Sequence, residues 1–151
     1  MQNNQRAVWV PGCGITPLPR QLAYRGLEVV ATDISPVAVG FQKQAAGQLD
    51  REIPDFGPRV PGGSLTAELH DFRTNFRSEA FDLILNMKSF QGFPAEDLPR
   101  IAATHAAALK PGRTAYFDTM NVQGERRDVL EQALTDGGFH VPLLKLNQWY
   151  R

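Results

Sequence analysis

Residues 7–35, with the sequence AVWVPGCGITPLPRQLAYRGLEVVATDIS, decide the fold of this chain. The run Ala7–Val10 is apolar, as expected for a strand buried on both faces of a parallel sheet. Gly12 and Gly14 follow directly and let the backbone turn tightly and approach a ligand. Leu27–Ala31 is a second apolar run, and Asp33 stands just after it. The stretch therefore predicts a strand, a glycine turn, a helix and a second strand.

The helix inside this unit is short and carries its own start and stop signals. We predict Thr16 as its N-cap and Pro17 at its first position, where a missing N–H group is tolerated. Gly26 follows the last apolar residues at helical spacing and ends the helix.

Asp33 lies about 20 residues beyond the glycines, the spacing at which a carboxylate binds a ribose diol. A dinucleotide site would also need a third glycine and free N–H groups in the first helical turn to hold a pyrophosphate. Pro17 and Pro19 remove two of those donors. The turn therefore favours a cofactor with a ribose but no phosphate, and a nicotinamide-dependent oxidoreductase is the weaker alternative.

The rest of the chain alternates strands with helices. Ser35 is predicted as the N-cap of a helix whose stripe of Val39, Ala46 and Leu49 is buried, whereas Gln42 faces water. A glycine- and proline-rich loop at 51–64 leads to a strand near a sheet edge. Strands are predicted at 65–72, 81–85, 113–118 and 139–146, and helices at 37–50, 95–109 and 124–136. This pattern predicts one domain over residues 1–151, with a doubly wound, mostly parallel Rossmann-like sheet flanked by helices.

The composition excludes several functional classes. Lys plus Arg and Asp plus Glu both number 16, so the formal net charge is zero and nothing attracts the chain to nucleic acid or anionic lipid. No apolar run approaches the length of a membrane span. One cysteine excludes an internal disulfide and suits a reducing compartment, so we expect a cytoplasmic protein. The three histidines lack metal-ligand spacing, and no metal site is expected.

Four stretches taken together resemble a known family. VPGCG at 10–14, DIS at 33–35, FDLILNMKSF at 81–90 and LKPGRTAYFD at 109–118 resemble the motifs of class I S-adenosylmethionine-dependent methyltransferases. The VPGCG motif is similar to that of the thiol and thiopurine methyltransferase-like branch. The resemblance runs from about Ala7 to Phe139, and it implies S-adenosylmethionine as cofactor and a small-molecule methyl acceptor.

The same resemblance implies the residues of the site. Gly12 to Gly14 would pass under the methionine part of the cofactor, and Asp33 would accept its ribose hydroxyls. Asp71, which is explained equally well as an ordinary loop acid, would lie near the adenine amine. The implied cofactor-binding residues are Pro11, Gly12, Cys13, Gly14, Asp33, Ile34, Asp71, Phe72, Asn86, Met87 and Lys88, and the acceptor-binding residues are Lys88, Ser89, Phe90, Phe93 and Asn121. No catalytic residue is predicted, because direct methyl transfer needs positioning rather than a triad, and Cys13 is expected to be a buried packing residue.

The chain departs from the family at three places. The turn after Gly14 reads Ile15-Thr16-Pro17 without the third glycine common in the family, Asn86 replaces an acid, and both ends are short, with a truncated C-terminal strand pair. An unpaired strand edge is unfavourable for a monomer. Three explanations remain open: a homodimer completes the sheet edge, the chain is a catalytically silent methyltransferase-like binding protein, or it is a fragment of a longer protein.

Overall fold

The computed structural model describes residues 6–87, 92–118 and 125–141. Within them, one parallel sheet has the strand order β3-β2-β1-β4-β5. Its strands are β1 (Ala7–Pro11), β2 (Glu28–Asp33), β3 (Ser64–Leu69), β4 (Phe81–Asn86) and β5 (Leu109–Phe117). The order reverses between β1 and β4, which is where open α/β sheets bind ligands. The doubly wound parallel fold predicted from the sequence is confirmed.

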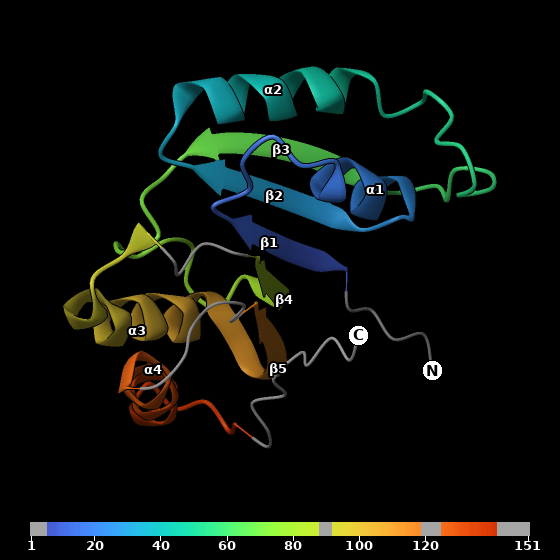
Figure 1. Cartoon of the computed structure of the whole chain (residues 1–151). Helices are drawn as coiled ribbons and strands as arrows, with labels where there is room; N and C mark the ends of the chain where they lie inside the picture. The colour runs from blue at the N-terminus through green and yellow to red at the C-terminus, as the bar shows by residue number, and fades with distance from the viewer. Residues whose placement is uncertain (1–5, 88–91, 119–124, 142–151) are drawn as a thin grey trace, which may run out of the picture.

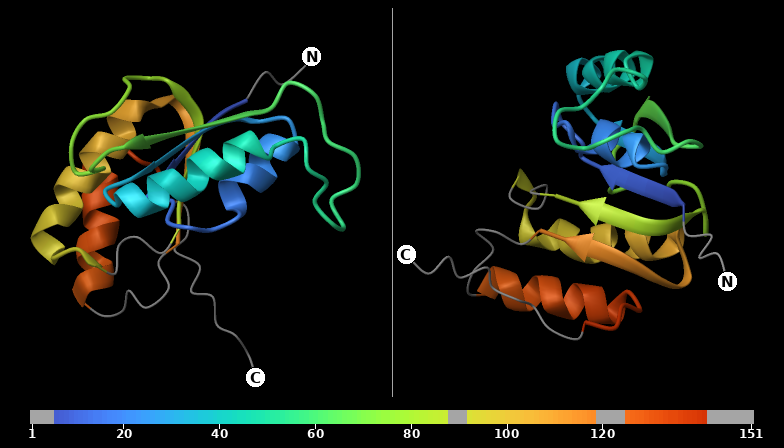
Figure 2. Two further views of the ribbon diagram at one scale, coloured as in Figure 1. Left: turned by 90° about the horizontal axis from the view of Figure 1, so that it is seen from above. Right: turned by 90° about the vertical axis from the view of Figure 1, so that its right-hand side faces the viewer.

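Helices cover both faces of the sheet (Figures 1 and 2). One layer holds α1 (Leu18–Tyr24) and α2 (Pro36–Gly47). The other holds the short 3₁₀ helix η2 (Ala95–Asp97), α3 (Leu98–Ala108) and α4 (Glu125–Asp136). The alternation of β1 supplies both cores, because Val8 and Val10 pack under the first layer and Trp9 under the second. No helix in the described ranges is both long and apolar enough to cross a membrane.

The start of α1 differs from the prediction. Pro17 is the N-cap, and its carbonyl accepts the N–H of Gln21 at 3.0 Å. Thr16 lies one residue too early to cap this helix, and its hydroxyl instead donates to the carbonyl of Cys13 at 3.2 Å. The prediction of Thr16 as N-cap was therefore wrong, and its side chain tightens the glycine turn.

Helix α2 confirms one prediction and corrects another. Ser35 is its N-cap and accepts the N–H of Ala38 at 3.3 Å, as predicted. Gln42, predicted to face water, is fully buried. The reason is its side-chain amide, which hydrogen-bonds to the turn after β1.

The C-terminal part is less regular than predicted. The helix expected at 95–109 is divided into η2 and α3, and β5 begins at Leu109 rather than Arg113. Leu109 pairs with Phe81 before the strand register shifts. Of the sixth strand predicted at 139–146, residues 139–141 are not in a strand, and the remainder lies outside the described residues.

Candidate functional site

The turn between β1 and α1 forms the first part of the site. Gly12 and Gly14 adopt φ values of 59° and 54°, which favour glycine. The N–H of Cys13 donates to the carbonyl of Thr32 at 3.0 Å and fixes the turn to β2. A Cβ atom built on Gly14 would meet no atom within 4 Å, so the backbone borders open space there. The turn is thus fixed to the sheet and still open to a ligand.

Asp33 ends β2 and reaches this turn. Its Oδ2 accepts the N–H of Gly14 at 2.9 Å, and its Oδ1 accepts the N–H of Ser35 at 2.9 Å. Each carboxylate oxygen offers two acceptor positions. One position on each oxygen therefore remains for an additional donor, which suits a pair of neighbouring hydroxyl groups.

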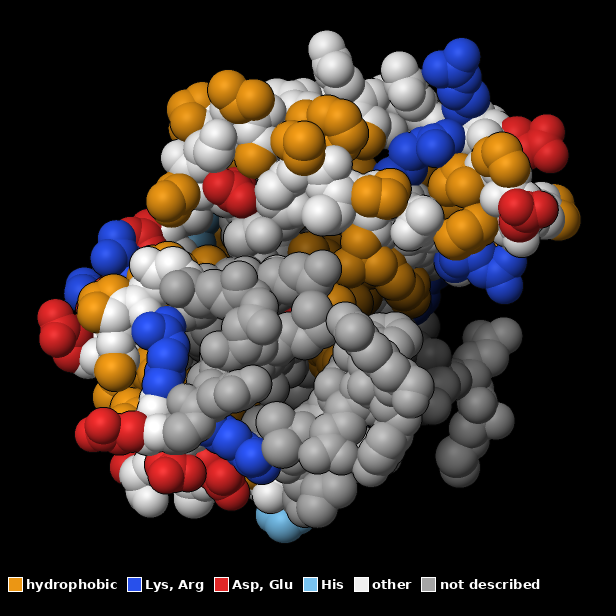
Figure 3. All heavy atoms as spheres, viewed as in Figure 1, with side chains coloured by type: hydrophobic (Ala, Val, Ile, Leu, Met, Phe, Trp, Pro, Cys, Tyr) orange, Lys and Arg blue, Asp and Glu red, His pale blue; other side chains and the backbone are white. Residues whose placement is uncertain are grey.

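Apolar side chains are exposed around the same turn. Ile34 is 62% exposed, and Ile15 and Val37 are exposed as well. Figure 3 shows hydrophobic side chains at the surface over the part of the molecule that carries α2. Because the Asp33 carboxylate lies beside this apolar surface, the arrangement suits a ligand with a polar sugar and a flat apolar ring.

Cys13 is buried in the turn, as the sequence predicted. Burial, and next the negative charge of Asp33, raise the pKa of its thiol to about 12. The thiol therefore stays protonated at neutral pH and is a poor nucleophile. Pro11, at the end of β1, is also buried.

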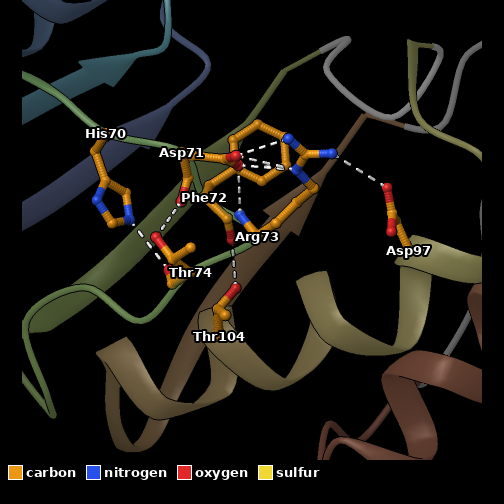
Figure 4. Close-up of polar contacts among 7 residues, drawn as sticks. All are labelled: His70, Asp71, Phe72, Arg73, Thr74, Asp97 and Thr104. Carbon is orange, nitrogen blue, oxygen red and sulfur yellow. Dashed lines mark hydrogen bonds and ion pairs between the residues drawn. The ribbon is translucent and has the colours of Figure 1, made fainter.

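The turn after β3 forms the second part of the site (Figure 4). The guanidinium of Arg73 contacts both oxygens of Asp71, with Nη2 at 2.7 Å from Oδ2 and Nε at 3.0 Å from Oδ1. The N–H of Arg73 also donates to Oδ1 at 3.0 Å. Its Nη1 lies 3.4 Å from a carboxylate oxygen of Asp97 beside α3. Hydrogen bonding from Arg73 lowers the pKa of the Asp71 carboxyl. Asp71 is thus already occupied by a cation.

Phe72 and Phe93 pack against each other in this second part. Phe72 is buried, its ring centroid lies 5.0 Å from that of Phe93, and its carbonyl accepts the Thr104 hydroxyl at 2.5 Å. Arg73 also lies over the Phe93 ring, 5.3 Å from its centroid. Thr104 of α3 thus fixes the backbone at Phe72, and the Phe93 ring is held between Phe72 and Arg73.

Asn86, at the end of β4, is fully buried and points to α3. Its Nδ2 lies 3.0 Å from Nε2 of His105, whose Nδ1 lies 2.8 Å from the carbonyl of Ile101. Because a carbonyl only accepts, Nδ1 carries the proton and Nε2 accepts from Asn86. Burial lowers the pKa of His105 to about 4, so the ring is neutral at physiological pH. The amide of Asn86 is thus used inside the core, and the role predicted beside the methyl group stays a prediction.

The remaining predicted residues divide into two groups. Met87 directly follows β4 and is half-buried. Four residues lie outside the described part of the chain, and their roles stay predictions: Lys88, Ser89, Phe90 and Asn121. The described residues contain no group of His, Cys, Asp and Glu side chains that could hold a metal ion.

Sequence reasoning missed Gln42, although a signal for its burial was present. Val39, Gln42, Ala46 and Leu49 follow the spacing of one helical stripe, and the polar residue lies within that buried stripe. A polar residue in such a stripe needs a partner inside the protein. Here the partners are the carbonyls of the glycine turn.

Comparisons with known proteins place this geometry in a family. A family model described as a methyltransferase domain matches residues 10–117. A S-adenosylmethionine-dependent methyltransferase from Methanosarcina mazei has a TM-score of 0.65 and 21% identity, over 76% of this chain and 52% of that chain. Magnesium protoporphyrin IX methyltransferase from Synechocystis, with bound S-adenosylmethionine, has a TM-score of 0.64 and 19% identity. The match covers 91% of this chain and 62% of that chain.

A putative sarcosine dimethylglycine methyltransferase from Galdieria sulphuraria has a TM-score of 0.67 and 17% identity, over 89% of this chain and 54% of that chain. The chain thus spans little more than half the length of these structures, and at such identities the likeness concerns the fold. A comparison with curated proteins finds no match. Since the matched residues 10–117 run from β1 to the end of β5, the chain belongs to the methyltransferase domain family.

Proposed function

We propose that this chain binds S-adenosylmethionine across the glycine turn and transfers its methyl group to a small-molecule acceptor. The observation that carries the proposal is the Asp33 carboxylate, which holds the N–H of Gly14 and keeps an acceptor position on each oxygen. Membership of the methyltransferase domain family supports the cofactor. The bound S-adenosylmethionine of the Synechocystis neighbour supports it as well.

The described residues fit the parts of this cofactor. Asp33 is proposed to accept the two ribose hydroxyls, and the open backbone at Gly14 to lie under the methionine part. Ile34, a large exposed apolar side chain, is proposed to cover the adenine ring. Asp71 and Phe72 are proposed at the far side of the adenine, where the Asp71 carboxylate is shared with Arg73.

The bound cofactor supplies an electrophilic methyl group on a sulfonium, and the protein positions the acceptor and excludes water. Positioning of this kind is worth about 7–11 kcal/mol in favourable cases. An acceptor with a low pKa, such as a thiol, needs little help from a general base, because it can lose its proton to water before it attacks. In the described part of the chain neither Cys13 nor His105 is suited to proton transfer, because burial keeps one protonated and the other neutral. Lys88, Ser89, Phe90, Phe93 and Asn121 are the proposed acceptor contacts.

The same proposal includes the branch of the family, the class of acceptor, the location and the oligomeric state. The VPGCG sequence supports the thiol and thiopurine methyltransferase-like branch, and the net charge of zero supports an acceptor other than nucleic acid. The single cysteine supports a cytoplasmic location. Among the described strands β5 pairs with β4 alone, which supports a homodimer that completes this edge.

A second candidate function is a catalytically silent, methyltransferase-like binding protein. It is favoured by Asn86, whose side chain is used by His105 where many family members carry an acid. On this alternative the fold still binds the cofactor, or another ligand with a ribose, without turnover.

Two measurements test the proposal. Isothermal titration calorimetry with S-adenosylhomocysteine is expected to give a dissociation constant in the micromolar range. Transfer of a labelled methyl group to a panel of small thiols is expected to exceed the rate without protein. Binding without transfer would favour the silent alternative, and a folded protein that gives no binding heat would refute the cofactor assignment.

A further inference from the structure

Gln42 connects helix α2 to the glycine turn. The side chain is fully buried, and its Nε2 lies 3.0 Å from the carbonyl oxygen of Gly14 and 3.0 Å from that of Thr16. The two N–H groups of one amide thus hold carbonyls on either side of Ile15. This contact is outside the roles assigned above, since Gln42 itself does not border the open space at Gly14.

The chemistry of the contact fixes the orientation of the amide. Both partners are carbonyl oxygens, so the NH₂ group must face them and Oε1 must point away. Oε1 has no hydrogen-bond partner among the described residues. A buried acceptor without a partner is unfavourable, and a methionine or leucine would fill the same stripe without it. A glutamine at this position makes two hydrogen bonds to the turn, which an apolar residue could not make.

With these hydrogen bonds, both the N–H and the carbonyl of Gly14 have a partner. Its N–H is held by Asp33 from β2, and its carbonyl is held by Gln42 from α2. A glycine at a positive φ would otherwise rotate more freely than any other residue. Pro17 and Pro19 have no N–H, so neither residue can donate a further backbone hydrogen bond to this turn.

We propose that Gln42 is a positioning residue for the methionine part of the cofactor, an inference that rests on the proposed function. It holds the carbonyls of Gly14 and Thr16 toward α2, so that neither oxygen turns into the space over the turn. The methionine part carries a carboxylate, which a carbonyl oxygen repels. Gln42 thereby acts through the backbone on one end of the ligand, while Asp33 holds the other end.

The test compares two ligands that differ in this part. S-adenosylhomocysteine carries the amino-acid end, and 5′-methylthioadenosine has the same nucleoside and sulfur without it. Gln42→Met keeps the length of the side chain and removes both donors. In calorimetry we expect the dissociation constant of S-adenosylhomocysteine to rise about tenfold to hundredfold, the range expected when buried carbonyls lose their donors. The constant of 5′-methylthioadenosine should change less than about threefold, because Asp33 and its contacts remain.

Gln44→Met is the matched control, since Gln44 is exposed on the same helix. It should leave both constants unchanged, and circular dichroism should show folded protein for both variants. If Gln42→Met does not fold, Gln42→Asn keeps an amide that is one methylene too short, and the same ratio of the two constants is measured. Equal weakening of both ligands, or unchanged binding of S-adenosylhomocysteine, overturns the positioning role. An unmodified protein that binds neither ligand overturns the proposed function, and the role with it.

Discussion

Two turns at the carboxyl ends of neighbouring strands carry an aspartate, and the two carboxylates differ in what surrounds them. Asp33, the last residue of β2, accepts one backbone N–H on each oxygen. Asp71, after β3, is held by the guanidinium of Arg73 on both oxygens. The first carboxylate retains acceptor positions for a ligand, and the second is already an ion pair. The same residue type at equivalent strand ends therefore has a different capacity to bind.

The supports beneath the two turns also differ. The first turn is held from α2 by the neutral amide of Gln42. The second is held from α3 by the Thr104 hydroxyl, and by the ion pair of Arg73 with Asp97 at the start of that layer. A neutral support is insensitive to pH, whereas charged and titratable groups are not. We therefore expect acid to act on the α3 side of the second turn, whereas the contacts of Gln42 with the first turn do not titrate.

The largest expected effect is acid destabilisation beneath the second turn. His105 packs edge-on against Phe72, with ring centroids 5.5 Å apart, and burial lowers its pKa from 6.5 to about 4. Between these values the unfolded chain binds a proton that the folded chain excludes, so stability falls as the pH drops from about 6.5 to 4. The difference between the two pKa values corresponds to about 3 kcal/mol.

Urea unfolding at several pH values measures this loss. His105→Gln removes the titrating ring, so its stability should be lower at neutral pH and should depend less on pH in this range. His140→Gln is the control, because His140 is exposed. If His105→Gln showed the same pH dependence as the unmodified protein, the buried neutral histidine would not be the acid-sensitive group.

The next largest effect is a loss of cofactor binding, and it is tested by replacing each of the two aspartates with asparagine. In Asp33→Asn, the new NH₂ group must face one of two backbone N–H donors, because both oxygens accept in the native protein. Loss of hydrogen bonds to a charged group costs about 1.5–3 kcal/mol each, so binding of S-adenosylhomocysteine should weaken about tenfold to hundredfold or more. Asp71→Asn should weaken it less than about fivefold, since Arg73 occupies that carboxylate. Calorimetry on both variants checks the order, and equal losses would remove the distinction between the turns.

The first turn was predictable from sequence because its signals are local. Gly12, Gly14 and Asp33 stand at spacings that follow from one strand–helix–strand unit, and Ser35 caps the next helix. The order of four motifs along the chain also indicated the family that the domain comparison shows. The methyl acceptor does not follow from these signals, since they concern the binding of the cofactor.

The partners of the residues that support the two turns were not predictable, for a different reason. Gln42 reaches residues 28 and 26 positions away, and Thr104 reaches a carbonyl 32 positions away. Such contacts depend on how α2 and α3 pack on the sheet, which hydrophobic periodicity does not specify. The Asp71–Arg73 pair lies within one turn, but adjacent opposite charges are common and give no sign of bidentate geometry. The displaced N-cap of α1 shows the same limit, because Thr16 satisfied the residue preference and Pro17 took the position.

The smallest expected effect concerns the ion pair itself. The side chains of Arg73 and Asp71 are 37% and 32% exposed, and pairs of this kind contribute about 1 kcal/mol or less to stability. Arg73→Gln should therefore leave the unfolding midpoint nearly unchanged, while the pKa of Asp71 rises toward its ordinary value because the hydrogen bonds from Arg73 are lost. The variant also frees acceptor positions on Asp71. If Asp71 contacts the adenine amine, Arg73→Gln should increase the preference for S-adenosylhomocysteine over S-inosylhomocysteine, which carries a carbonyl in place of that amine. An unchanged preference would show that Asp71 serves the turn rather than the ligand, and would leave Asp33 as the one aspartate of the two that selects the cofactor.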